Sequence, residues 1–356
     1  MHRLLVLILS VALTAGCRQA SHNDDTLHTV SAVPDSFTVE TLLPTTPVKS
    51  QGLSALCWLY AMLATIESDR LAMGDSVNLS PLWLVRHSLI EQAEMTYLTQ
   101  RRVTMRGILP EAMRLMQTYG IVAWDSYHAD PMPSARLARA VNETAMTLSA
   151  QQKGLETTRQ SIEETLDREI GPAPHNVFMY RAEYTPLEFA HSVCLPGEWE
   201  AYTSFTHHPF GTQNIIEARD NTRMHTARNI RAEELLRLVV RSLADRHPVA
   251  WEGSMKLATA PDRRLDHTAD SSAYFDAIQN ERQRLLERHI LTDDHCMAIV
   301  GIAYAPETHG KAQKRKRYFI CKNSWGTDDG TNGFRFISEQ QLLLSTILIM
   351  AKTGDN

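Results

Sequence analysis

The stretch from Gln51 to Trp58 contains the residue types of an activated nucleophile. Cys57 offers a thiol, and Gln51 places a side-chain amide six residues before it. The apolar residues that follow recur with the period of a helix buried on one face, at Leu59, Met62, Leu63 and Ile66. At the start of such a helix, free N–H groups and the helix dipole favour the reactive thiolate. On this stretch alone a structural thiol stays the commoner alternative, because free cysteines often pack as small apolar residues.

A nucleophilic cysteine needs a base, a group that orients the base, and donors for the oxyanion formed at an attacked carbonyl. His295 opens an apolar run and is the candidate base, and Asn323, in Asn-Ser-Trp-Gly, can orient its imidazole. Gln51 supplies a side-chain donor that would join the backbone N–H of Cys57 in an oxyanion hole. We therefore expect Cys57, His295 and Asn323 to be catalytic.

The elements that must position these residues differ between the two halves of the chain. Ser80 before Pro81 and Pro110 followed by Gly120 predict two more helices after the one at Cys57. A polar, helix-favouring stretch covers about 134–169. The last third contains strand-like apolar runs at 297–304, 318–322 and 334–337, and the first two predict an antiparallel hairpin.

This combination of motifs resembles the papain-like cysteine peptidases. Gln51 six residues before Cys57-Trp58, a histidine that opens a strand, and Asn323-Ser-Trp-Gly326 occur in the family's order. Ser54 and Ala55 stand where papain itself has a disulfide-forming cysteine and a glycine, which is more similar to the bleomycin hydrolase or aminopeptidase C branch. The resemblance runs from about Phe37 to the end. It implies an α+β fold with a helical N-terminal lobe and an antiparallel, sheet-rich C-terminal lobe.

The resemblance also implies further assignments. Gly107, Trp58 and Trp325 would bind substrate, and Trp325 would shield the bond between Asn323 and the histidine. Cys57 and His295 are 238 positions apart, against the roughly 130–150 of short papain-like enzymes. A helical insertion within about 131–245 of a peptidase domain at 37–356 would account for the excess.

The type of peptidase stays open between an aminopeptidase and an endopeptidase. Bleomycin hydrolases carry a C-terminal arm in the cleft, whereas this chain stops 33 residues after Asn323, so we expect the arm to be absent or cut short. The hexamer of that branch is not strongly expected. An amidase or acyltransferase with the same triad, or a catalytically silent surface-binding homologue, are the alternatives.

The first 36 residues predict export. A short basic head precedes an apolar run from Leu4 to Ala15, which is too short to span a bilayer. The run ends in small residues before Cys17, which resembles a bacterial lipoprotein signal at 1–17 with Cys17 as the lipidated residue. Residues 18–36 then read as a flexible tether. We expect a lipoprotein anchored in the bacterial cell envelope, with secreted or periplasmic protein as the alternative.

The overall charge and the cysteine and histidine content limit other functions. A formal charge of −5 over 356 residues gives no global electrostatic case for a nucleic-acid partner. Two free thiols are expected at Cys296 and Cys321, although a bridge between neighbouring strands is possible. His207, His208 and His225 match no regular ligand spacing, so neither a metal nor a cofactor is expected. A peptide is the expected substrate.

Overall fold

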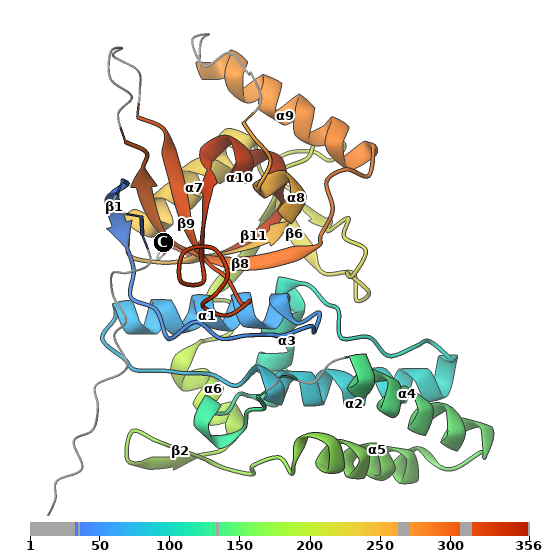
Figure 1. Cartoon of the computed structure of the whole chain (residues 1–356). Coiled ribbons are helices and arrows are strands. Elements are labelled where there is room, and N and C mark those ends of the chain that lie inside the picture. The colour runs from blue at the N-terminus through green and yellow to red at the C-terminus, as the bar shows by residue number, and fades with distance from the viewer. Residues whose placement is uncertain are drawn as a thin grey trace, which may run out of the picture.

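The computed structural model describes residues 33–34, 36–130, 132, 135–262, 271–306 and 315–354. The chain forms a helical layer and a sheet layer, with helix α1 (Cys57–Ala72) between them, as Figure 1 shows. Helix α1 packs on strand β8 on one side and on the helices α2 and α3 on the other. Its residues from Trp58 to Asp69 are therefore nearly all buried, and not only those on the predicted face.

The helical layer follows the predicted boundaries closely. Helix α2 (Pro81–Thr99) begins after Ser80, whose side chain accepts a hydrogen bond from the Trp83 N–H. Helix α3 (Leu109–Tyr119) ends at Gly120, where φ is 76° and an added Cβ would lie 2.1 Å from the Pro186 backbone. Because only glycine fits this turn, it fixes where α3 ends against the start of helix α6 (Pro186–Val193). A short 3-10 turn, η1, covers Trp124–Ser126.

The sheet layer is one mixed sheet in which β8 pairs with three other strands. The strands of the sheet are β1 (Thr38–Leu42), β4 (Trp199–Thr203), β5 (Gln213–Ile215), β6 (Thr226–Asn229), β7 (Val249–Gly253), β8 (His295–Tyr304), β9 (Arg317–Lys322), β10 (Phe334–Ser338) and β11 (Thr346–Lys352). Their order is β10-β9-β8-β7-β11-β4-β6-β5, and β1 pairs with β8. All pairs except the parallel β4–β6 pair are antiparallel. The hairpin predicted at 297–322 is β8 with β9.

Helices cover the sheet on the side away from α1 (Figure 1). They are α7 (Ala232–Ala244), the short α8 (Met255–Ala258), α9 (Ser271–Glu287) and α10 (Glu339–Ser345). Arg282 of α9 is fully buried and donates from Nη2 to the Thr346 carbonyl oxygen at 2.9 Å and from Nε to the Ser204 carbonyl oxygen at 3.2 Å. It therefore ties α9 to the start of β11 and to the end of β4.

The segment 131–245 is more mixed than a helical insertion. Helices α4 (Ala135–Ala150) and α5 (Leu155–Ile170) match the predicted polar helical stretch and pack on α2. The strands β2 (Val177–Met179) and β3 (Ala182–Tyr184) then form a small separate hairpin. The remainder returns to the other layer, because β4, β5 and β6 extend the main sheet. The sequence predicted a strand at 177–180, which β2 confirms, but it gave no clear signal for β4, β5 and β6.

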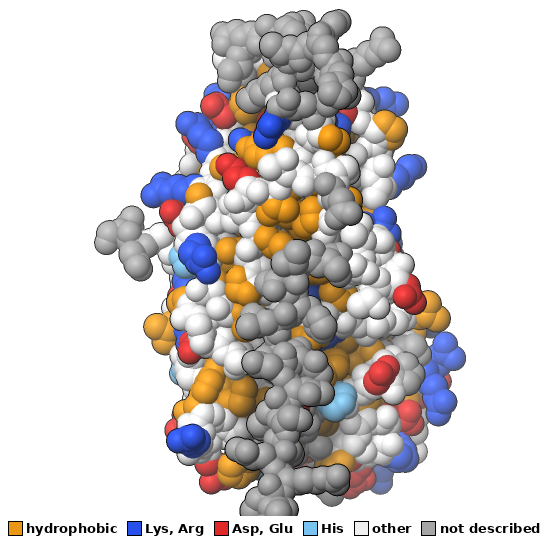
Figure 2. Space-filling model, turned by 60° about the vertical axis from the view of Figure 1, so that its left-hand side comes forward, with side chains coloured by type: hydrophobic (Ala, Val, Ile, Leu, Met, Phe, Trp, Pro, Cys, Tyr) orange, Lys and Arg blue, Asp and Glu red, His pale blue; other side chains and the backbone are white. Residues whose placement is uncertain are grey.

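The molecular surface mixes charge and apolar side chains. Figure 2 shows hydrophobic side chains along the middle of one face, with charged side chains of both signs towards its edges. Among the described residues, no helix is both long and apolar enough to cross a membrane. The predicted signal, Cys17 and nearly all of the tether lie outside the described residues.

Candidate active site

Cys57 is the first residue of α1 and is partly exposed. Hydrogen bonds from the Cys296 thiol and from His295 hold the pKa of the Cys57 thiol well below its ordinary value of 9.0, although burial opposes this shift. The charge of a protonated His295 acts in the same direction. Cys57 is therefore a thiol poised to ionise, with its candidate base beside it.

His295 is held on the side away from the thiol by Asn323. Its Nε2 lies 2.7 Å from Asn323 Oδ1, and both residues are 3% exposed. The ring of Trp325 lies over the imidazole, with centroids 4.3 Å apart. Because Asn323 Oδ1 is an acceptor, it requires a proton on Nε2 and leaves Nδ1 for the thiol. Trp325 covers this bond, as the resemblance implied.

Asn323 is itself oriented by a neighbour that the sequence did not indicate. Its Nδ2 donates to Asp329 Oδ2 at 2.7 Å, and its Oδ1 also accepts from the Ser324 N–H at 2.9 Å. Arg335 forms an ion pair with Asp329, and this arginine together with Asn323 holds the pKa of Asp329 below its ordinary value, against the effect of burial. Asp329 thus fixes which end of the amide faces His295.

Gln51 lies at the other side of the thiol and is 5% exposed. Its Nε2 donates to the Ser54 carbonyl oxygen at 2.6 Å, and its Oε1 accepts from Ser324 Oγ at 2.7 Å. The Oε1 contact fixes the amide orientation, so that the second N–H of Nε2 stays available. Gln51 also lines the cleft beside Cys57. This is the placement that an oxyanion-hole donor requires.

The cleft over Cys57 has a volume of about 280 Å³. Gly107 and Trp325 line it with Cys57 and His295, as expected. Trp58 does not fit its predicted role in substrate binding, because it is 2% exposed and donates from Nε1 to the Met105 carbonyl oxygen at 3.1 Å. Its indole packs directly beneath Gly107 and supports the cleft wall.

A charged group lies at one side of the cleft. Arg106 donates from Nε to Asp220 Oδ2 at 2.6 Å, and the Asp220 N–H donates to Asp293 Oδ2 at 3.2 Å. Burial raises the pKa of Asp293. Asp294 instead caps α8, where it accepts from the Met255 N–H at 2.7 Å. With two carboxylates and one guanidinium, Arg106, Asp220 and Asp293 make this part of the cleft wall acidic.

Glu252 is a buried carboxylate near Cys57 that no sequence motif indicated. It lies in β7, is 1% exposed, and accepts from the Leu109 N–H at the start of α3 at 2.9 Å. Burial raises its pKa well above the ordinary value, and the Asp293 and Cys57 charges add to this shift. Glu252 therefore joins the helical layer to the sheet close to Cys57.

Of the other cysteines and histidines that the structure describes, six are candidates for a disulfide, a metal or a catalytic role, and one of these six contacts Cys57. Cys194, Cys296 and Cys321 are buried and free, so β8 and β9 carry no disulfide. Cys296 contacts Cys57. His225 pairs with Glu111 at 2.7 Å, whereas His207 and His208 meet at Glu217, away from the residues that line the cleft.

One protein-family model matches part of the chain. Residues 264–350, which include His295 and Asn323, match the family model "Papain family cysteine protease". The chain contains a papain-type cysteine peptidase domain. Cys57 precedes the matched range, but the structure places it beside His295. The matched domain, with the cysteine beside its histidine, makes the protein a hydrolase of the cysteine-peptidase type.

Three solved structures are similar to this chain, and the first of them supports the fold. The structure of PepW from Lactobacillus rhamnosis HN001 superposes with a TM-score of 0.64 at 16% identity, covering 91% of this chain and 83% of PepW. A structure concerning the mite allergens Blo t 1 and Der p 1 gives 0.41 at 15% identity, covering 92% and 73%. SERA5E from Plasmodium falciparum gives 0.41 at 11% identity, covering 87% and 90%. No curated protein sequence matches the chain.

Proposed function

We propose that this papain-type domain hydrolyses peptide bonds with Cys57 as nucleophile, His295 as base and Asn323 as the group that orients the base. The observation that carries the proposal is the continuous contact from Asp329 through Asn323 and His295 to the Cys57 thiol. The Asn323–Asp329 and His295–Asn323 hydrogen bonds both measure 2.7 Å, and His295 in turn lowers the pKa of the Cys57 thiol. This arrangement supplies the base and its orienting group as nucleophilic catalysis requires.

The reaction runs in two halves. The Cys57 sulfur attacks the peptide carbonyl carbon, and the oxyanion is stabilised by Gln51 Nε2 and the Cys57 backbone N–H. His295 then gives a proton to the leaving amine, and a thioester remains on Cys57. Water, deprotonated by His295, attacks the thioester carbonyl, and the acid product leaves with the thiol restored.

We place the protein nearest to the bleomycin hydrolase or aminopeptidase C branch and propose endopeptidase action. Ser54 and Ala55 in the nucleophile segment support the branch. Among the described residues, the last ones run along the sheet and away from Cys57. Lys352 pairs with Asp69 near the far end of α1, and the Thr353 N–H donates to the Glu198 carbonyl oxygen at 2.8 Å. None of residues 350–354 lines the cleft.

Matched peptides separate endopeptidase from aminopeptidase action. One set of fluorogenic peptides carries a free amino terminus and the other an acetylated one, with the sequence unchanged. We expect both sets to be cut at internal bonds, with cleavage lost in Cys57→Ala. Release of single amino-terminal residues from the free set alone would show an aminopeptidase. Hydrolysis of only non-peptide amides, or acyl transfer to an added amine without hydrolysis, would favour the amidase or acyltransferase alternative.

We also propose that the chain is a lipoprotein of the bacterial cell envelope, anchored through Cys17. The support is the sequence pattern, in which a basic head, an apolar run and small residues precede that cysteine. Fractionation of cells that express the full chain and Cys17→Ser tests the proposal. The full chain should be found with membranes and should incorporate labelled fatty acid, whereas Cys17→Ser should lose both properties. Equal labelling of both would contradict lipidation at Cys17.

A further inference from the structure

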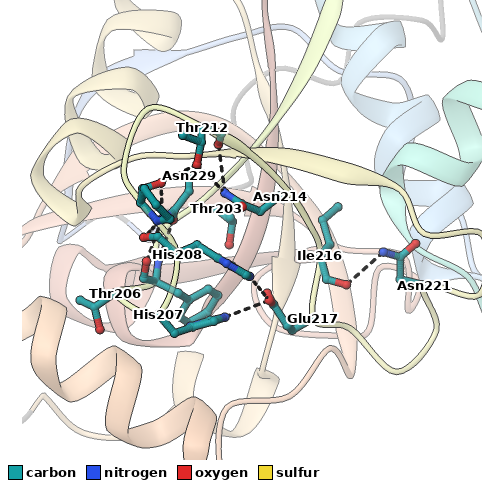
Figure 3. Close-up of polar contacts among 12 residues, drawn as sticks. Thr203, Thr206, His207, His208, Thr212, Asn214, Ile216, Glu217, Asn221 and Asn229 are labelled. Carbon is teal, nitrogen blue, oxygen red and sulfur yellow. Dashed lines mark hydrogen bonds and ion pairs between the residues drawn. The ribbon is translucent and has the colours of Figure 1, made fainter.

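Three side chains outside the catalytic cleft bring metal-binding atoms to one point. His207 Nε2 lies 2.8 Å and His208 Nε2 2.5 Å from the same oxygen, Glu217 Oε1. Both imidazoles and the carboxylate converge in Figure 3. We propose that His207, His208 and Glu217 form a binding site for a divalent transition metal, with Zn²⁺ as the ion that fits the donor atoms.

The donor set selects the class of ion. Two imidazole nitrogens and one carboxylate oxygen suit zinc, which takes three protein ligands and leaves further positions for water. Calcium and magnesium prefer oxygen donors only. The three ligand atoms lie within 4.8 Å of one another, and tetrahedral zinc bonds of about 2.0–2.2 Å place ligand atoms roughly 3.4 Å apart. Small side-chain rotations therefore suffice to enclose the ion.

The backbone that carries the two histidines is held in place by a buried amide. Asn229, at the end of β6, is 1% exposed. Its Nδ2 donates to the carbonyl oxygens of Phe205 at 2.8 Å and His208 at 2.9 Å, and its Oδ1 accepts from the Phe205 N–H at 2.9 Å. Figure 3 shows Asn229 above the histidines, at the base of the loop that carries them. The loop after β4 thus presents both imidazoles from a fixed backbone.

The backbone on either side of Glu217 is also held. The Ile216 N–H donates to the His225 carbonyl oxygen at 3.0 Å, and the Ile216 carbonyl oxygen accepts from Asn221 Nδ2 at 3.0 Å, as drawn in Figure 3. The Ala218 N–H donates to the same Ile216 carbonyl oxygen at 2.9 Å. The carboxylate therefore meets the imidazoles without ordering of a loose loop, which lowers the entropic cost of binding an ion.

The second nitrogen of His207 has the partner that a metal ligand requires. Its Nδ1 lies 3.3 Å from Gln283 Oε1 and 3.2 Å from Gln283 Nε2 on helix α9. That amide oxygen also accepts from the Thr206 N–H at 2.8 Å, and Gln283 Nε2 donates to Glu287 Oε1 at 2.8 Å, which fixes its orientation. A proton on Nδ1 directed at the amide oxygen leaves Nε2 free to bind a metal.

An ion can reach the site from solvent, since the side chains of His207, His208 and Glu217 are 33%, 32% and 38% exposed. None of the three lines the catalytic cleft. The ion would therefore join the loop after β4 to the loop after β5 without taking part in peptide hydrolysis. The adjacent pair His207-His208 did not reveal this site in the sequence, because the third ligand, Glu217, follows nine residues after His208.

Calorimetric titration of the full chain with Zn²⁺ tests the site. The titrations use a Cys57→Ser background, because the catalytic thiolate is itself a zinc ligand. We expect one ion per chain, with affinity at least about tenfold weaker in His208→Ala and in the isosteric Glu217→Gln. His225→Ala is the matched control, because His225 pairs with Glu111 at 2.7 Å but, within the described part of the chain, belongs to no group of three metal-binding side chains.

Thermal unfolding with and without Zn²⁺ provides a second readout. The parent and the His225→Ala control should gain melting temperature with Zn²⁺, and Glu217→Gln should gain little. Co²⁺ in place of Zn²⁺ should give the visible bands of a four-coordinate site in the parent only. Absence of binding by the parent, or equal binding by parent, His208→Ala and Glu217→Gln, would overturn the proposal. If His208→Ala fails to fold, Glu217→Gln decides.

Discussion

Replacement of Asp329 by alanine should impair catalysis without removing any group that touches the substrate. Asp329 Oδ2 is the acceptor for Asn323 Nδ2 at 2.7 Å. Asn323 is 3% exposed, so solvent cannot fully replace the lost carboxylate. A buried donor without its partner costs about 1–3 kcal/mol. The amide can escape that cost only by turning, which withdraws Oδ1 from His295.

The expected loss of rate follows from this energy. If the whole cost appears as lost orientation of the imidazole, kcat/KM falls by about 5- to 150-fold, since each 1.36 kcal/mol is tenfold. KM should change little, because Asp329 does not line the cleft. Asp329→Asn keeps an oxygen at the same place for Asn323 and should recover most of the rate. The exposed neighbour Asp328 gives the matched control, Asp328→Ala.

The split between kcat and KM separates this positioning role from a merely structural one. In Asp329→Ala, kcat should fall while KM stays close to the parent value, because Asp329 acts on the orientation of Asn323 and does not line the cleft. Asp329→Asn should keep most of the parent kcat. An Asp329→Ala enzyme that is less stable but has an unchanged kcat would refute this reasoning.

Three further predictions follow from local contacts. The thiol of Cys57 should be alkylated by iodoacetamide well below pH 9, and Cys296→Ala should move the midpoint upward, because the Cys296 hydrogen bond is the largest cause of the lowered pKa; an unmoved midpoint would contradict that cause. Gly107→Ala should lower the free energy of unfolding, measured by urea titration, by about 1–3 kcal/mol, because its Cβ would lie 2.8 Å from two indole atoms of Trp58. The control is Gly354→Ala, where an added Cβ meets no atom within 4 Å. Burial lowers the pKa of Lys322 from 10.5 to about 7. The unfolded chain therefore binds this proton more tightly than the folded chain, and the contribution of Lys322 to stability rises as the pH increases above 7. Lys322→Met should show a smaller gain in unfolding free energy between pH 7 and pH 9 than the parent, and an equal gain would exclude this effect.

The parts of the fold that local signals define were predictable from sequence. Ser80 and Pro81 define the start of α2, and Gly120 defines the end of α3, because caps depend on neighbouring residues. Long apolar runs in the last third define β8 and β9, because such a run is also a signal carried by neighbouring residues. The short strands β4, β5 and β6 were missed because pairing with β11 and with each other, rather than local pattern, makes them strands.

Some residues of the candidate site lie in local sequence motifs, and others are brought to the site only by the fold. Cys57, His295 and Asn323 lie in motifs with recognisable neighbours, so their residue types and order single them out as candidates, and the structure brings them together. Glu252 reaches the N–H of Leu109, 143 positions away, and no sequence pattern links the two.

Trp58 shows the opposite case. Its motif is conspicuous, but burial beneath Gly107 gives it a packing role that the motif does not distinguish from substrate binding.

Active-site titration measures whether the Cys57 thiol carries the peptide hydrolysis. The full chain is treated with an epoxide-type thiol inhibitor, the labelled peptide is located by mass spectrometry, and residual peptide hydrolysis is measured on the same sample. We expect one label per chain at Cys57, loss of hydrolysis in proportion to labelling, and slow labelling in His295→Ala. Hydrolysis that persists in fully labelled protein or in Cys57→Ala, or a label at another cysteine that abolishes hydrolysis, would contradict this role of Cys57.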